Sequence, residues 1–153
     1  MFRQEVTGAL LYYGDDEFVF QQRSLDVKRN PGRIGLFGGQ LHAGEHPDFG
    51  IRRELGEEIV PVKFMGGVVL RRLGAYEIDS QVTGRDNIVY YLYSANINSY
   101  PLDSREGQAK IRSLEWFLGM CHESPDMVSP AASYVVQRAL QEGAEEWRLA
   151  LQI

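Results

Sequence analysis

Segments rich in β-branched and aromatic residues alternate with two helical segments, and this order constrains the fold most strongly. Residues 6–13 and 17–24 flank a Gly-Asp-Asp turn, a pattern typical of an antiparallel hairpin. Residues 47–60 begin with proline and carry aliphatic residues at a spacing of four, which indicates an amphipathic helix. More strand-like segments and a second helical segment follow. The order strands, helix, strands, helix predicts an α/β (α+β) fold with a mixed sheet between helices.

The rest of the chain supplies the remaining expected elements. Further strands are predicted at residues 34–40, 62–73, 86–97 and 114–117. Gly66 and Gly67 predict a bulge in one of these strands. Residues 24–35 are basic and rich in turn-forming residues, so we expect a loop there. Residues 128–143 open with Ser-Pro and carry apolar residues on one face, which predicts a closing amphipathic helix.

The composition is that of one globular domain spanning residues 1–153. Of these residues, 44% are hydrophobic and 24% charged, enough to bury a sizeable core. The net charge of −5 argues against a partner such as long nucleic acid, which is bound through phosphate neutralisation. Cys121 is the only cysteine, so an intrachain disulfide is excluded, which fits a reducing compartment. The chain starts without a signal-peptide pattern, and no apolar run reaches the roughly 18 residues of a membrane span, so we expect a cytoplasmic protein with no membrane partner.

Three carboxylates share one face of the first predicted helix. Glu54, Glu57 and Glu58 stand at i, i+3 and i+4, where each like-charge pair costs a helix roughly 0.2–0.5 kcal/mol. Gly56 lies beside them and costs about 1 kcal/mol relative to alanine. A cluster of oxygen ligands with little local compensation suits Mg²⁺ or Mn²⁺ better than a soft metal. The sequence therefore predicts a divalent cation that offsets the repulsion.

The segment before this helix is expected to fold back over the start of the helix. Gly38 and Gly39 permit a tight turn and a close approach of the backbone to a ligand or an ion. Gly44 makes a second bend next to Glu45. Because Glu45 precedes Arg53 by eight residues, we expect an ion pair that clamps the loop to the helix.

Together these residues resemble the Nudix box of the Nudix hydrolases. The box has the form G-x5-E-x7-R-E-U-x-E-E-x-G-U, in which U is aliphatic. Its glycine and charged positions correspond here to Gly39, Glu45, Arg53, Glu54, Glu57 and Glu58. The chain departs from the pattern at its end, where Val60 replaces a glycine and Pro61 an aliphatic residue. These departures affect the end of the helix, whereas every charged residue of the box is present.

The resemblance implies a MutT-like protein with a Nudix-type α/β/α sandwich. It implies Mg²⁺- or Mn²⁺-dependent hydrolysis of a diphosphate bond in a nucleoside diphosphate linked to another group X. The implied metal ligands are Gly38, through its carbonyl, and Glu54, Glu57 and Glu58. Arg53 would position the acids, through Glu45, and one of the three helix glutamates or Glu106 would act as general base. Glu106 lies in a polar loop similar to the loop of MutT-like enzymes that supplies an additional glutamate, although its spacing to Trp116 is longer.

Several residues are candidates for contact with a small nucleotide-type substrate. Arginines near the box, Arg23 and Arg33, suit bidentate capture of phosphate, together with Lys28 and Arg29. Gly39 and His42 lie in the box itself. The competing interpretations are a solvated basic loop and a surface histidine. The hairpin aromatics Tyr12, Tyr13 and Phe20 are expected in the core rather than stacked on a base.

Two other functions are compatible with this fold. A Nudix-fold nucleotide-binding or sensor module would bind without turnover, but retention of every acid favours catalysis. A Nudix-fold isomerase of isopentenyl diphosphate would be expected to place a cysteine in its site, whereas Cys121 lies towards the C-terminal end. A homodimer is compatible with the sequence, which does not specify the group X.

Overall fold

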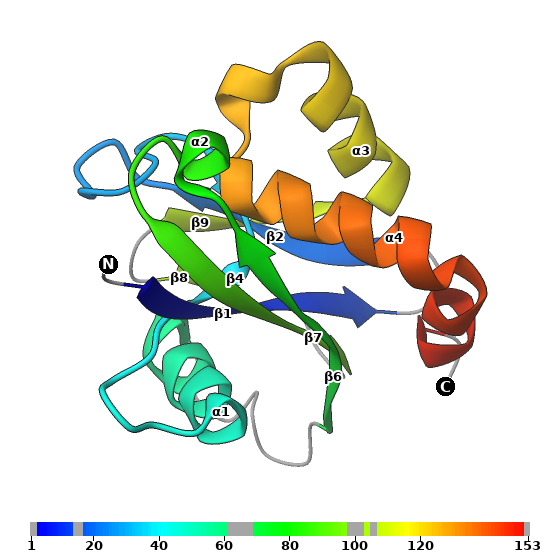
Figure 1. The fold of residues 1–153 in the computed structure, drawn as a ribbon. Coiled ribbons are helices and arrows are strands. Elements are labelled where there is room, and N and C mark those ends of the chain that lie inside the picture. The colour runs from blue at the N-terminus through cyan, green and yellow to red at the C-terminus, as the bar shows by residue number, and fades with distance from the viewer. Residues whose placement is uncertain (1–2, 14–16, 61–68, 98–102, 105–106, 152–153) are drawn as a thin grey trace.

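The computed structural model describes residues 3–13, 17–60, 69–97, 103–104 and 107–151. In chain order the elements are β1 (Arg3–Tyr13), β2 (Glu17–Arg23), β3 (Ile34–Gly35), β4 (Phe37–Gln40), α1 (Pro47–Glu58), β5 (Ile59–Val60), β6 (Leu70–Ile78), α2 (Ser80–Thr83), β7 (Asn87–Asn96), β8 (Asp103–Ser104), β9 (Gly107–Arg112), α3 (Leu114–Glu123), η2 (Pro125–Met127) and α4 (Pro130–Leu151). A twisted sheet separates α1 on one face from α3 and α4 on the other (Figure 1). The predicted mixed sheet between helices is confirmed. Within the described ranges, no helix is long and apolar enough to cross a membrane.

The central strand of the sheet is β1, and its pairing places the double glycine. It runs parallel to β7 along almost its whole length, and its last residues pair antiparallel with β2. Its middle residues, Val6 to Ala9, pair antiparallel with β4 instead. The overall strand order is β5-β8-β9-β2-β1-β7-β6, with β3 on β2 and β4 on β1. Because β4 replaces β2 beside the middle of β1, Gly38 and Gly39 lie near the centre of the sheet.

Alternating side chains of β1 divide the core into two layers. Leu10 and Tyr12 pack towards α3 and α4, whereas Ala9 and Leu11 belong to the layer beneath α1. A strand buried on both faces has a nearly continuous apolar sequence, as β1 does from Ala9 to Tyr12. Tyr12 and Phe20 are buried, as expected for core residues, and the side chain of Tyr13 lies outside the described part of the structure.

Hydrogen bonds join the N-terminus of α1 to side chains of β6 and β7, at one edge of the sheet. Asp48, in the first turn of the helix, accepts hydrogen bonds from the Tyr93 hydroxyl and, at 2.9 Å, from Nη2 of Arg72. These two donors lower the pKa of the Asp48 carboxyl, and Tyr93 makes the larger contribution. Burial, supported by the bond to Asp48, raises the pKa of Tyr93 to about 12. The helix that carries the clustered acids is therefore fixed in direction by β6 and β7.

The strand predicted at residues 114–117 is wrong, because these residues form the start of α3. Ser113 caps this helix by accepting a hydrogen bond from the Trp116 backbone N–H at 3.0 Å. The aromatic residues that suggested a strand pack on Phe20 instead, with the rings of Phe20 and Phe117 stacked 4.6 Å apart. The longest strand that the sequence missed is β9, whose Gly-Gln-Ala-Lys-Ile-Arg sequence has weak β character and is held by pairing with β2.

Other boundaries differ by a few residues. Helix α1 ends at Glu58, and Ile59 and Val60 pair with β8, so the chain leaves the helix directly into a short strand. The strand predicted at 62–73 is observed from Leu70 onwards, and the predicted bulge at Gly66 and Gly67 lies outside the described residues. A register shift occurs instead between Arg72 and Gly74. The closing helix continues past residue 143, where Gly143 has non-helical dihedral angles.

Candidate active site

The double glycine brings the backbone of β4 against Glu54. Gly38 has a φ of 151°, and a Cβ at this position would collide with the carbonyl oxygen of Thr7. A Cβ on Gly39 would lie 2.5 Å from Oε2 of Glu54. The Thr7 hydroxyl holds this part of β4 by donating a hydrogen bond to the Gly39 carbonyl at 3.1 Å. Only glycine at residue 39 lets the Glu54 carboxylate rest on the backbone of β4.

Arg53 connects the loop before α1 with two of the acids. Its Nε and Nη2 donate to the two oxygens of Glu45 at 2.8 and 2.9 Å, the bidentate geometry that favours arginine. Its Nη1 donates to Glu54 at 3.0 Å and to Glu57 at 3.2 Å. Nη2 also donates to the carbonyl oxygen of Gln40 at 3.2 Å. The predicted ion pair between Glu45 and Arg53 is present, and the same guanidinium holds the loop, β4 and the acids together.

Glu45 is stabilised in its charged form. Hydrogen bonds from Arg53 first, and from the backbone N–H of His42 second, lower its pKa from 4.5 to about 2. The bond from His42 measures 3.0 Å. Glu45 thus accepts hydrogen bonds from Arg53 on α1 and from His42 in its own loop. These bonds hold the loop of residues 42–45 against the helix.

We expect this ion pair to make stability depend on pH in a defined window. The folded pKa of Glu45 is about 2, below the unfolded value of 4.5, so its contribution is present above about pH 4.5. It is lost progressively as the pH falls from about 4.5 to 2, because protonation removes the charged partner of Arg53. Urea unfolding of wild type and Glu45→Gln at several pH values measures the contribution as the difference between the two proteins. A difference that stayed constant from pH 6 to pH 2 would contradict this assignment.

The three acids of α1 do not share one environment. The Glu54 side chain is 13% exposed and packed on Gly39, whereas Glu57 is 51% exposed. The side chain of Glu58 lies outside the described part. The expectation that the cluster has little local compensation is wrong for Glu54 and Glu57, because Arg53 pairs with both. Among the side chains that the structure describes, which exclude Glu58 and Glu106, no three His, Cys, Asp or Glu residues converge as a metal-binding group.

The chemistry of this donor set fits a hard divalent cation. Carboxylate and carbonyl oxygens are the ligands that Mg²⁺ and Mn²⁺ prefer. The Glu54 carboxylate occupies a cradle on β4 that a side chain at residue 39 would fill. The residues that would hold the ion through side chains therefore lie on one helix, with glycine backbone beside it.

We expect Gly39→Ala to impair the site more than the fold. The added methyl group would displace the Glu54 carboxylate, and overpacking of this kind costs about 1–3 kcal/mol. Activity on any substrate of the wild-type protein should fall, which steady-state kinetics would measure, and urea unfolding would measure the loss of stability. Gly56→Ala is the matched control, because a Cβ at Gly56 meets no described atom within 4 Å. This control should gain up to about 1 kcal/mol of helix stability. Equal activity of the Gly39→Ala and Gly56→Ala variants would contradict the proposed contact.

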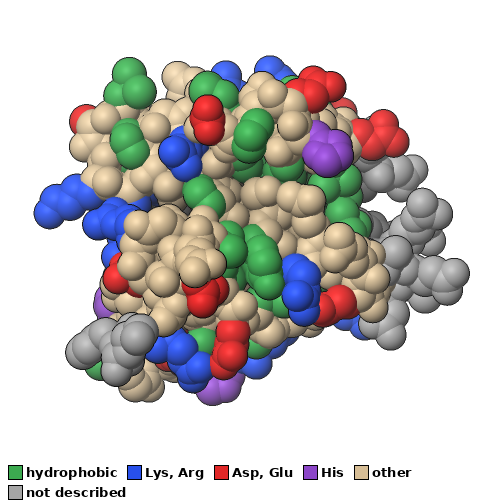
Figure 2. Space-filling view, turned by 45° about the horizontal axis from the view of Figure 1, so that its top comes forward, with side chains coloured by type: hydrophobic (Ala, Val, Ile, Leu, Met, Phe, Trp, Pro, Cys, Tyr) green, Lys and Arg blue, Asp and Glu red, His purple; other side chains and the backbone are tan. Residues whose placement is uncertain are grey.

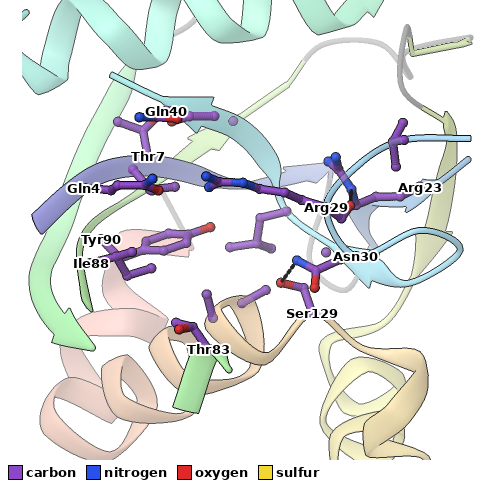
Figure 3. Close-up of a pocket in the computed structure, with 18 of the residues that line it drawn as sticks. Gln4, Thr7, Arg23, Arg29, Asn30, Gln40, Thr83, Ile88, Tyr90 and Ser129 are labelled. Carbon is purple, nitrogen blue, oxygen red and sulfur yellow. Dashed lines mark hydrogen bonds between the residues drawn. The ribbon is translucent and has the colours of Figure 1, made fainter. Parts of the chain in front are cut away.

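Glu54 lines a cavity of about 580 Å³. Figure 3 shows this cavity with most of its lining residues. Its lining combines the double glycine with β1, the basic loop, the segment after α2, β7 and the start of α4. The lining residues include Gln4, Val6, Arg23, Lys28, Arg29, Leu36, Gly38, Gly39, Glu54, Arg85, Ile88, Tyr90, Ser129, Ala131 and Ala132. A concave site of this volume is in the usual range for small-molecule ligands.

Sequence reasoning identified part of this lining. Of the predicted site residues, Arg23, Gly38, Gly39 and Glu54 line the cavity. Arg33 and His42 are not among its lining residues. Glu106 lies outside the described residues, so its predicted role stays a prediction.

The other lining residues were missed because they converge through long-range pairing. Gln4 and Tyr90 meet only because β1 and β7 are parallel neighbours, and no local motif marks either residue. Ser129 reaches the basic loop through Asn30, whose Nδ2 donates to its hydroxyl at 3.4 Å. The one available signal was the Ser-Pro start of the closing helix, which predicted that helix but not its contact with the loop.

Four basic residues line the cavity although the whole chain is acidic. Arg23, Lys28 and Arg29 belong to the basic loop or its base, and Arg85 approaches from the segment after α2. Figure 2 shows Lys and Arg side chains gathered at the side of the molecule where this loop lies. A local cation cluster can attract an anionic substrate in spite of the net charge of −5.

Comparison with known proteins identifies the fold and the family. Solved structures with the same fold include the MutT protein of Methanosarcina mazei Go1, with 21% identity, a TM-score of 0.72, and coverage of 92% of this chain and 95% of that one. The NUDIX domain of Shewanella oneidensis NrtR, complexed with ADP ribose, has 17% identity, a TM-score of 0.68, and coverage of 93% and 89%. A bifunctional NMN adenylyltransferase/ADP ribose pyrophosphatase of Francisella tularensis, complexed with AMP and a Mn ion, has 16% identity, a TM-score of 0.63, and coverage of 92% and 42%. At these identities the likeness shows the fold alone.

The family assignment comes from the sequence. No curated protein matches the chain. The family model of the NUDIX domain matches residues 2–119, a segment that contains the double glycine, the Glu45–Arg53 ion pair and all of α1. The protein therefore belongs to the NUDIX domain family, the family of the Nudix hydrolases that its sequence resembles.

Proposed function

We propose that this Nudix hydrolase cleaves a diphosphate bond in a nucleoside diphosphate linked to a second group, with Mg²⁺ or Mn²⁺ as cofactor. The observation that carries the proposal is the position of Glu54. Its carboxylate rests on Gly39, is held by Arg53 and lines a cavity of suitable size. Glu54 thus lies in the lining of a cavity that also contains basic and apolar side chains.

The residues that would hold the ion are Glu54, Glu57 and Glu58, with the carbonyl of Gly38. A bound ion would supply charge neutralisation of the diphosphate and would lower the pKa of the attacking water. Arg53 orients Glu54 and Glu57, and Glu45 keeps Arg53 in place. One of the helix acids or Glu106 would accept the proton of the attacking water.

We assign substrate capture to the basic residues that line the cavity. The guanidinium of Arg23 donates from Nε to the carbonyl of Arg29 at 2.7 Å, which shapes the loop around the cavity. Together with Lys28 and Arg29, it offers positive charge to the anionic part of a substrate. The expected substrate is a small nucleotide in the cytoplasm rather than long nucleic acid.

A substrate panel tests this function. The protein is incubated with Mg²⁺ or Mn²⁺ and nucleoside triphosphates, damaged nucleotides, nucleotide sugars, dinucleotides and ADP-ribose, and the products are identified by chromatography and mass spectrometry. We expect at least one member to be cleaved between two phosphorus atoms, and addition of EDTA to stop the cleavage. Binding of a panel member without turnover under either metal would favour a nucleotide-binding module and contradict the proposal.

A further inference from the structure

Thr7, in the middle of β1, is a buried polar residue beside the double glycine. It is only 1% exposed. At this point β1 and β4 pair antiparallel, with Thr7 opposite Gly39 and Gly8 opposite Gly38. Figure 3 shows Thr7 next to Gln40, the residue that follows the double glycine. The proposed hydrolysis assigns no role to Thr7, although its side chain contacts the backbone of the double glycine.

The double glycine does not fix its own backbone conformation. Gly38 has a φ of 151°, which residues with a Cβ rarely adopt. Because glycine has so few forbidden conformations, two glycines in succession leave the orientation of the peptide between them to outside contacts. Pairing with β1 supplies one such contact, and the Thr7 hydroxyl supplies another by donating a hydrogen bond to the Gly39 carbonyl at 3.1 Å.

β4 also lies very close to β1 at this point. A Cβ on Gly38 would collide with the carbonyl oxygen of Thr7 and would lie 2.7 Å from Cα of Gly8. Two strands can approach in this way only where one of them has no side chain. The hydrogen bond from Thr7 holds β4 in this close approach.

Two consecutive carbonyls of β4 are held by two different elements. Thr7 of β1 donates to the Gly39 carbonyl, and Nη2 of Arg53 on α1 donates to the Gln40 carbonyl at 3.2 Å. These two bonds fix β4 between the central strand and the helix that carries the acids.

The orientation of Glu54 depends on this placement of β4. A Cβ on Gly39 would lie 2.5 Å from Oε2 of Glu54, so the carboxylate is packed directly on the β4 backbone. The Glu54 side chain is 13% exposed, and Nη1 of Arg53 donates to it at 3.0 Å. Because closely packed groups transmit displacements, a shift of Gly39 has to move the Glu54 carboxylate as well.

Neither packing nor strand propensity requires a hydroxyl at residue 7. Valine has nearly the same volume as threonine and is also enriched in strands. It would avoid the cost of burying a polar group. What threonine adds at this position is the hydrogen bond to Gly39, so the role of the hydroxyl lies at the double glycine.

We propose that Thr7 is a positioning residue whose hydroxyl, through the Gly39 backbone, holds the Glu54 carboxylate in the orientation that binds a divalent cation. The choice of a divalent cation rests on the proposed function. Cation binding does not require turnover, so the two proposals can fail separately.

Mn²⁺ titration followed by electron paramagnetic resonance tests this role through the dissociation constant of the ion. Thr7→Val replaces only the hydroxyl and should weaken Mn²⁺ binding by about tenfold or more, the scale for residues that orient metal ligands. Thr7→Ser keeps the hydroxyl and loses the methyl group, so it should bind Mn²⁺ as wild type does. Thr7→Ala lacks both groups and should weaken binding as Thr7→Val does. Urea unfolding without metal verifies that each variant is folded.

Ile78→Val is the control for a general loss of stability. Ile78 is 1% exposed in the core layer beneath α3 and α4, and it is not among the lining residues of the cavity. This variant should unfold at a lower urea concentration and bind Mn²⁺ as wild type does. Wild-type affinity in both Thr7→Val and Thr7→Ala would overturn the proposal, and so would equal weakening in Thr7→Ser and Thr7→Val.

A double variant tests whether Thr7 acts through Glu54. If it does, Thr7→Val should weaken Mn²⁺ binding much less in a Glu54→Gln protein than in wild type, because the two effects are coupled. The same fold-change in both backgrounds would refute this route. Mn²⁺ binding that depends on the Thr7 hydroxyl in a protein that hydrolyses no panel member would support the positioning role and contradict only the proposed hydrolysis.

Discussion

Glu57→Gln and Glu58→Gln should each lower turnover of any substrate found in the panel by about 10²–10⁴-fold, the usual contribution of a group that transfers protons or holds a catalytic ion. Each substitution keeps the size of the side chain and removes one negative charge from the site. The ratio of kcat between variant and wild type, measured at saturating Mg²⁺, is the readout. Higher Mg²⁺ concentration should restore part of the activity if the lost group is a metal ligand.

The same variants should remain folded. Glu57 is half-exposed and pairs with Arg53 across one helical turn, so its substitution should change the free energy of unfolding by less than about 1 kcal/mol without metal. Glu123→Gln is the matched control, since Glu123 is exposed at the end of α3, on the opposite face of the sheet from α1. Activity close to wild type in both Glu57→Gln and Glu58→Gln would disprove the assignment of the metal site.

Arg53→Lys should also be severely impaired, although it preserves the charge. A lysine ammonium cannot reproduce the bidentate contact with Glu45 together with the contacts to Glu54 and Gln40. The loop and the Glu54 carboxylate should therefore shift relative to each other. Misplacement of a reacting group by about 1 Å can cost about 10²-fold in rate, and we expect a loss of this order in kcat.

Arg52→Lys provides the control for this prediction. Arg52 is the neighbouring arginine on α1, its side chain is exposed, and it lies outside the cavity lining. Its substitution should leave kcat within about twofold of wild type, because surface changes of this kind have small effects. Similar kcat values for the Arg53→Lys and Arg52→Lys variants would show that the contacts of Arg53 do not position the acids.

The sequence predicted the elements whose signals are local. The hairpin from β1 to β2 and helix α1 were recognised from turn residues, the first-turn proline and apolar spacing. Strand β9 was missed because a tertiary contact decides it, whereas the start of α3 was assigned as a strand although the Ser113 cap is a local signal. Pairing with β2 holds a segment of weak β propensity, and Ser113 caps a helix whose aromatic residues resemble those of a strand.

The residues of the candidate site also divide into those with a local sequence signal and those without one. Its charged half follows from one stretch of chain, in which Glu45, Arg53 and Glu54 meet across a single loop and helix. The i,i+4 spacing of Arg53 and Glu57 was a local signal for their ion pair that was missed, whereas the contact of Arg53 with the adjacent Glu54 depends on side-chain conformation. Gln4 and Tyr90 could not be predicted, since they are brought together by the parallel pairing of strands far apart in sequence.

Mn²⁺ titration followed by electron paramagnetic resonance measures whether the acids of α1 form a divalent cation site. The signal of free Mn²⁺ should be quenched by wild-type protein with one strong binding phase. Glu54→Gln and Glu57→Gln should weaken that phase by about tenfold or more, the scale expected when a metal site loses part of its support. Glu123→Gln should bind Mn²⁺ as wild type does. Identical Mn²⁺ binding in wild type, Glu54→Gln and Glu57→Gln would contradict the account.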